Sequence, residues 1–179
     1  MKKKTFWTLL LMQVSLIAVA QKYIVEKSNV GFFSTTTLED IKASNSKSAS
    51  IFNTSTSEIV FSIPISEFEF DKSLMKEHFN EKYMETEKYP KAKFQGSING
   101  FDPARSRSQI ITASGKLTMH GITKEVEIPG AMEVKNSRIE AGAKFIVKLA
   151  DYQITIPQLM WQNIADQVEV TLAFTYKPL

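Results

Sequence analysis

Strict alternation of apolar and polar side chains constrains the fold of this chain more than any other feature. In the segment 166–177 the apolar side chains fall on one face, and they are Val168, Val170, Leu172, Phe174 and Tyr176. Segment 138–149 repeats the pattern with Ile139, Ala141, Ala143, Phe145, Val147 and Leu149. A period of two residues is typical of β-strands with one buried face. Two long segments of this regularity predict a mainly β protein.

The rest of the chain extends this prediction to a sheet of about eight strands. Residues 109–149 read as a three-stranded antiparallel meander with turns at His120-Gly121 and Asn136-Ser137, and a glycine supplies the positive φ that a tight hairpin requires. Segments 23–34, 38–53, 58–70 and 92–101 also have strand-like composition. One amphipathic helix is expected near residues 72–84. A single helix within such a meander is expected to cover one end of a barrel or one face of a sheet.

The N-terminus reads as an export signal. Three lysines at positions 2–4 precede an apolar stretch, and small residues then lead to Ala20. We expect cleavage after Ala20, a single mature domain over residues 21–179, and a periplasmic or secreted location; an uncleaved anchor is the alternative. The apolar stretch is too short for a stable membrane span, which needs about 20 residues.

Removal of the signal also changes the charge of the protein. Three of the 22 Lys and Arg residues lie in the signal, which leaves 19 against 19 Asp and Glu residues. A neutral mature chain with no basic cluster argues against binding to nucleic acid. The chain contains no cysteine, which excludes disulfides, thiolate metal sites and a thiol nucleophile.

The residue types that carry catalysis do not form a recognisable pattern. The chain has two histidines, His78 and His120, too few for a zinc-protease motif. Ser114 lacks the flanking glycines of a nucleophile elbow. We therefore expect no enzymatic activity, no catalytic residues and no metal site, although an unrecognised carboxylate site remains an alternative. His78 is expected to be a partly buried histidine of the helix, with contact to a ligand as the alternative, and His120 is expected to have a structural role at its turn.

Two motifs resemble a known family. The segment EHFNEKYMETEKYPKAKFQGSI at 77–98 and the segment GKLTMHGITK at 115–124 are similar to the helix-to-strand segment and the hairpin of YceI-like proteins. The resemblance covers nearly the whole mature chain. It implies a lipocalin-like antiparallel barrel with a helix near one end. It also implies an elongated apolar channel for a polyisoprenoid or other lipid-like molecule, in proteins that are often periplasmic and are not established enzymes.

From these observations the expected function is non-catalytic sequestration or carriage of a long apolar molecule. No cofactor is expected apart from a bound isoprenoid or fatty lipid. The residues expected to line the channel are Phe33, Phe61, Phe94, Leu117, Phe145, Val147, Leu172 and Phe174 from the strands, with Phe79 and Tyr83 from the helix. A barrel packed solid by its own side chains, acting as an envelope interaction or structural module, is the alternative. A homodimer through a long strand edge also remains open.

Overall fold

The computed structural model describes residues 22–35, 40–155 and 165–179, so the expected signal peptide lies outside the described residues. Ten strands dominate this part of the chain. Their bounds are β1 (Lys22–Ser34), β2 (Ile41–Asn45), β3 (Ala49–Asn53), β4 (Glu58–Pro64), β5 (Glu69–Phe70), β6 (Lys91–Asn99), β7 (Gln109–Met119), β8 (Ile122–Lys135), β9 (Arg138–Lys148) and β10 (Gln167–Pro178).

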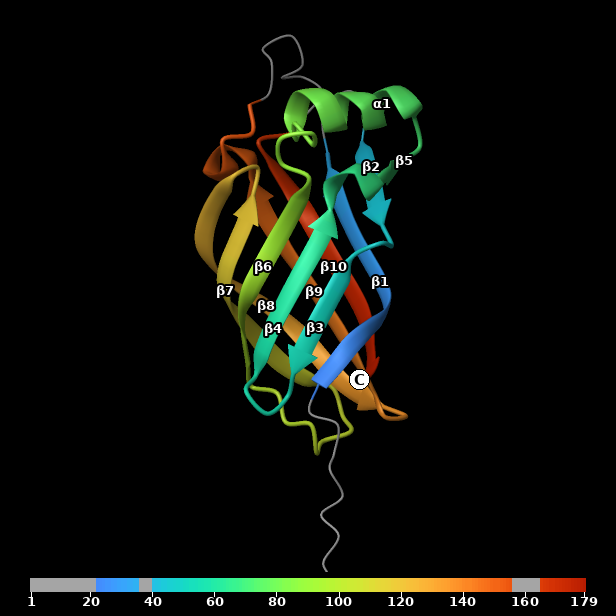
Figure 1. The fold of residues 1–179 in the computed structure, drawn as a ribbon, viewed down its shortest axis with the longest axis vertical. Helices are drawn as coiled ribbons and strands as arrows, with labels where there is room; N and C mark the ends of the chain where they lie inside the picture. Colours follow the sequence, from blue (N-terminus) through green and yellow to red (C-terminus); the bar gives the residue numbers. More distant parts are fainter. Residues whose placement is uncertain (1–21, 36–39, 156–164) are drawn as a thin grey trace, which may run out of the picture.

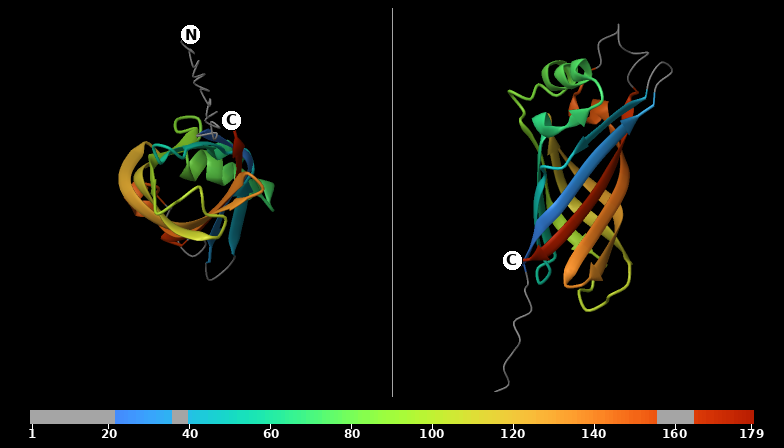
Figure 2. Two further views of the ribbon diagram at one scale, coloured as in Figure 1. Left: turned by 90° about the horizontal axis from the view of Figure 1, so that it is seen from below. Right: turned by 90° about the vertical axis from the view of Figure 1, so that its right-hand side faces the viewer.

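Eight of these strands close into an antiparallel barrel (Figures 1 and 2). Their order around the barrel is β10-β9-β8-β7-β6-β4-β3-β1, and β1 pairs with β10 from Tyr23↔Pro178 to Phe33↔Glu169. Strands β2 and β5 extend the sheet beyond β1 at one end. The predicted meander is confirmed as β7, β8 and β9, and both of its turns contain residues with positive φ. The prediction of a mainly β, eight-stranded barrel with one helix is therefore confirmed.

The helical segment lies across one end of the barrel, which we call the helix end (Figure 1). It consists of α1 (Ser73–His78) followed directly by a π-helical turn, η2 (Phe79–Tyr83). In the turn the Met84 amide donates to the Phe79 carbonyl at 2.9 Å, a bond that spans five residues instead of four. The position of the helix agrees with the predicted range of 72–84, but the π-turn adds one residue to its last turn.

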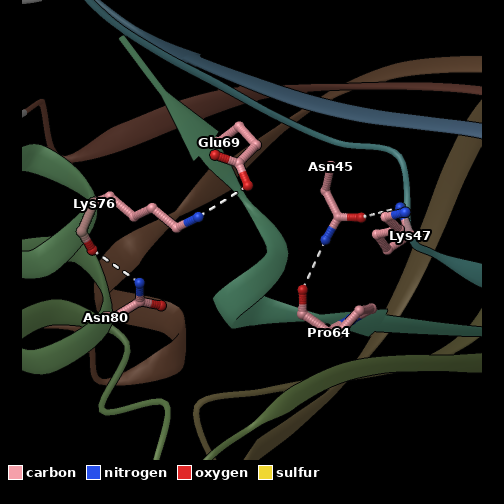
Figure 3. Close-up of polar contacts among 6 residues, drawn as sticks. All are labelled: Asn45, Lys47, Pro64, Glu69, Lys76 and Asn80. Atoms are coloured by element: carbon pink, nitrogen blue, oxygen red, sulfur yellow. Dashed lines mark hydrogen bonds and ion pairs between the residues drawn. The ribbon is translucent and has the colours of Figure 1, made fainter. Parts of the chain in front are cut away.

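A buried asparagine breaks the predicted strand 38–53 into β2 and β3 (Figure 3). The Asn45 Nδ2 donates to the Pro64 carbonyl at 2.7 Å, and its Oδ1 accepts from the Lys47 amide at 2.7 Å and from the Ser48 hydroxyl at 3.3 Å. Asn45 is fully buried. The same side chain therefore fixes the bend and holds it against the end of β4.

The opposite end of the barrel, which we call the floor, is packed solid. Tyr176, Ile139 and Phe52 are 0%, 0% and 1% exposed, and the Phe52 ring packs on Tyr176 and Phe101. The Tyr176 hydroxyl and the Ser50 hydroxyl share a 2.8 Å hydrogen bond. Burial raises the pKa of Tyr176 far above its ordinary value. These two buried hydroxyl groups therefore satisfy each other, as polar groups in an apolar interior must.

Candidate functional site

An apolar cavity of about 660 Å³ occupies the barrel between the floor and the helix end. Along β10 it is lined from Val168 to Phe174, a run of roughly 20 Å at about 3.4 Å per residue. With a strand tilt of about 40°, the cavity extends roughly 15 Å along the barrel axis. It is therefore an elongated chamber that is closed below.

The inward-facing side chains confirm that this chamber is hollow. Leu117, Phe145, Val170 and Leu172 point into it, yet each remains partly exposed because no side chain covers it from the opposite wall. The inward residues at the floor, by contrast, have almost no exposed surface. An interior filled by its own side chains would bury both groups equally. The barrel is therefore packed at one end and open within at the other.

Nine of the ten residues expected to line a channel contribute to the wall of this cavity. They are Phe61, Phe79, Tyr83, Phe94, Leu117, Phe145, Val147, Leu172 and Phe174. They come from β4, β6, β7, β9, β10 and the helical segment. Alternation along each strand brings them together, because every second side chain points to the barrel axis.

Phe33 is the exception, and its predicted position is corrected. Its ring lies on the other face of β1, where the Lys42 Nζ is 5.3 Å from the ring centroid, and Phe32 lines the cavity instead. The reason is a bulge between Val25 and Lys27. A bulge adds one residue to a strand and therefore reverses which positions point inward. Inward positions are odd-numbered before the bulge, as at Tyr23, and even-numbered after it.

Four phenylalanines secure the helical segment to the barrel. Phe79 of η2 has its ring centroid 5.4 Å from Phe32, 5.7 Å from Phe68 and 5.0 Å from Phe70. Phe32, Phe68 and Phe70 were not predicted from the sequence as residues of the site. The alternation of Phe68 and Phe70 was a usable signal, but their contact with Phe79 depends on the tertiary fold.

We infer that the cavity opens to the protein surface beside the first turn of α1, where two of its lining residues are exposed. Lys72 and Leu74 belong to its lining, and Leu74 is 58% exposed. Lys76, one turn further, is paired with Glu69 of β5 at 2.9 Å (Figure 3). The start of the helix therefore forms one side of a mouth, and the aromatic cluster around Phe79 forms the anchored side.

A histidine latch fastens the chain after the helix to the rim of the barrel. The His120 Nε2 lies 2.9 Å from the Glu85 carboxylate, and its Nδ1 lies 3.1 Å from the Tyr152 carbonyl. The Tyr89 ring packs edge-on against the imidazole at 4.6 Å. Gly121, with φ of 77°, leaves room for that ring, since a Cβ there would come within 2.6 Å of it. The predicted structural role of His120 thus has a physical basis.

The charged side chains of the described residues form pairs at the surface. No group of three or more His, Asp or Glu side chains among them could hold a metal ion. Carboxylates with close partners, such as Glu26 with Arg138 at 2.7 Å, lie on the outer surface, and that bond lowers the pKa of Glu26. Within 22–35, 40–155 and 165–179, no helix is long and apolar enough to cross a membrane.

A closed antiparallel barrel with an apolar chamber and a helix over one end defines the lipocalin-like class of architecture. The chain belongs to a specific family within this architecture: the YceI-like domain matches residues 22–176. The resemblance seen in the two sequence motifs is thereby confirmed. No curated protein was found to match the sequence.

Solved structures share this fold at low sequence identity. A polyisoprenoid binding domain from Saccharophagus degradans, implicated in plant cell wall breakdown, has a TM-score of 0.75 at 17% identity over 88% of this chain and 98% of its own. BcnA of Burkholderia cenocepacia has a TM-score of 0.70 at 15% identity over 83% and 95%. A YceI protein of Campylobacter jejuni has a TM-score of 0.61 at 12% identity over 79% and 86%.

Proposed function

We propose that this protein binds an isoprenoid or another long apolar lipid-like molecule inside its barrel and thereby sequesters or carries it. The observation that supports the proposal is the hollow chamber of about 660 Å³ with an almost wholly apolar wall. Such a wall stabilises a bound chain by about 0.8 kcal/mol for each methylene group removed from water. We assign ligand contact to the nine predicted wall residues and to Phe32, which takes the place of Phe33.

A solved structure of similar fold supports the proposed ligand, and the N-terminal sequence supports a proposed location. A domain of similar fold from Saccharophagus degradans is described as polyisoprenoid binding. The composition of residues 1–20 matches an export signal, so we propose cleavage after Ala20 and a periplasmic or secreted location. The protein acts by binding alone, without a catalytic step, and any homodimer would leave this chamber within each subunit.

The alternative of a solid barrel that serves only as an interaction module fits the structure less well. A solid barrel requires inward side chains to fill the interior, whereas Phe145 and Leu172 remain partly exposed within it. This alternative predicts that the purified protein carries no ligand and displaces none.

The direct experiment is native mass spectrometry of the full chain purified from its own host, followed by organic extraction. We expect an adduct that extraction removes and that dissolves in the organic phase. A matched variant, Ala143→Phe, places a ring inside the chamber and should purify with less of the adduct. Repeated recovery of a ligand-free protein that also fails to take up geranylgeraniol would refute the proposed function.

A further inference from the structure

The polar groups of the cavity wall are confined to one end. Among the described lining residues, the polar side chains are Ser34, Lys72, His78 and Tyr83. Ser34 ends β1 at the helix end, and the other three belong to the helical segment or directly precede it. The wall from there to the floor is apolar. A ligand with one polar group would therefore fit with that group under the helix and its chain toward the floor.

Two of these four groups are already engaged. The Ser34 hydroxyl is buried and accepts a hydrogen bond from the Ala165 amide at 3.3 Å. Lys72 is exposed at the mouth and has an interaction of its own. By contrast, neither the His78 imidazole nor the Tyr83 hydroxyl has a hydrogen bond or an ion pair with any described residue. Among the lining residues that the structure describes, they are the polar groups with free hydrogen-bonding capacity.

The π-turn is what places these two side chains together. Five residues along a regular α-helix correspond to about 500°, which would leave Tyr83 about 140° away from His78 around the axis. The extra residue of the π-turn reduces this separation to about 40°. Both side chains therefore face the cavity. Single π-turns within α-helices are frequent at functional sites.

The surroundings of Tyr83 favour an uncharged partner. Burial alone raises the pKa of Tyr83, which indicates a partly dehydrated hydroxyl. A charged group in an apolar site is costly unless an opposite charge pairs with it. The lining cation, Lys72, lies at the exposed mouth and is already engaged. A neutral oxygen, as in an alcohol or a carbonyl, satisfies the hydroxyl and the imidazole without that cost.

We propose that Tyr83 and His78 form a head-group site for an uncharged oxygen, so that the ligand is a single-headed amphiphile bound with its apolar chain toward the floor. This inference rests on the proposed function, because it identifies the chemical class of the molecule in the same chamber. It adds a hydrogen-bonding requirement that an apolar wall alone would not impose.

The test compares three probes that share one chain: geranylgeraniol, the hydrocarbon in which hydrogen replaces its hydroxyl, and geranylgeranyl phosphate. Affinities are measured on the full chain by displacement of a fluorescent apolar probe. Tyr83→Phe and His78→Leu remove the hydrogen-bonding groups and retain apolar bulk, and Leu172→Ala serves as a control in the apolar wall.

We expect Tyr83→Phe to weaken binding of the alcohol by about 3- to 10-fold, the loss of one neutral hydrogen bond, with the hydrocarbon changed by less than about 2-fold. His78→Leu should behave in the same way, whereas Leu172→Ala should weaken both probes by a similar factor. A thermal midpoint retained in Tyr83→Phe would exclude a general structural effect.

Each other outcome overturns the inference. If the alcohol and the hydrocarbon bind equally and neither variant separates them, the head-group site fails while the proposed function stands. If the phosphate binds most tightly and loses most in the variants, the site recognises an anion and the choice of an uncharged head is wrong. If no probe binds, the proposed function fails, and the head-group site fails with it.

Discussion

Substitution of Ala143 by leucine tests whether the chamber is hollow in solution. Ala143 lies on β9, opposite Gly130 of β8 and Leu172 of β10, and its methyl group faces the cavity. Leucine adds three carbons, worth up to about 2.4 kcal/mol at about 0.8 kcal/mol each. Ordering its side chain costs about 0.5–1 kcal/mol. We therefore expect Ala143→Leu to stabilise the ligand-free protein by about 1–2 kcal/mol.

A packed interior predicts the opposite sign, because extra carbons in a filled core cost about 1–3 kcal/mol. The matched control is Ile139→Phe at the floor, where the side chain is 0% exposed and overpacking is expected. Urea unfolding of protein from which lipid has been extracted gives the free energy of unfolding for both variants. The affinity for geranylgeraniol, measured by displacement of a fluorescent apolar probe, should fall in Ala143→Leu but not in Ile139→Phe. If Ala143→Leu destabilises the protein as much as Ile139→Phe does, the barrel is not hollow.

Three further predictions concern the floor, the bend and the latch. Tyr176→Phe should cost about 1–3 kcal/mol in urea unfolding because it leaves the Ser50 hydroxyl buried without its partner, and adding Ser50→Ala should recover most of that loss. The pKa of Tyr176 is raised in the folded state, so its neutral hydroxyl contributes fully to the free energy of unfolding below about pH 10 and contributes less as the pH rises further. Tyr176→Phe should abolish this part of the pH dependence. Asn45→Ala should lower the free energy of unfolding by about 1–3 kcal/mol; a smaller loss would mean that the bend does not depend on this side chain. His120→Ala should accelerate hydrogen exchange at the amides of residues 88 and 89 before it changes global stability, and unchanged exchange would argue against a latch.

The fold could be predicted from the sequence because apolar and polar side chains alternate along most strands. Residues 109–149 form long hairpins whose turns the sequence marks, at Gly121 and at Asn136, so strand number and pairing follow locally. The break at Asn45 could not be predicted in the same way. Its cause is the hydrogen bond from the Asn45 side chain to the Pro64 carbonyl, 19 residues away. A contact of that kind cannot be predicted from the residues next to Asn45.

Most residues that line the cavity could be predicted from the sequence, but the local geometry that orients them and the volume of the interior could not. Phe32 and Phe33 are adjacent phenylalanines, and only the bulge at Val25 decides which of them points inward. Similarly, the position of Tyr83 depends on one extra residue in a helical turn. Whether the interior is hollow depends on the radius of the barrel against the summed volume of its side chains, a balance that alternation does not contain.

The pairing of β1 with β10 joins the first strand that the structure describes to the last one, from Tyr23↔Pro178 onward. Each hairpin of the meander can form from residues that are close in sequence. The pairing of β1 with β10, in contrast, must bring together two segments that are separated by nearly all the residues between Tyr23 and Pro178. Contacts of such separation form slowly, since the entropy of closing the loop is lost before the contacts compensate for it. This pairing therefore completes only after the last strand has been synthesised. Until then β1 and the growing end of the sheet both expose unpaired edges, so a chain truncated before Gln167 should remain aggregation-prone.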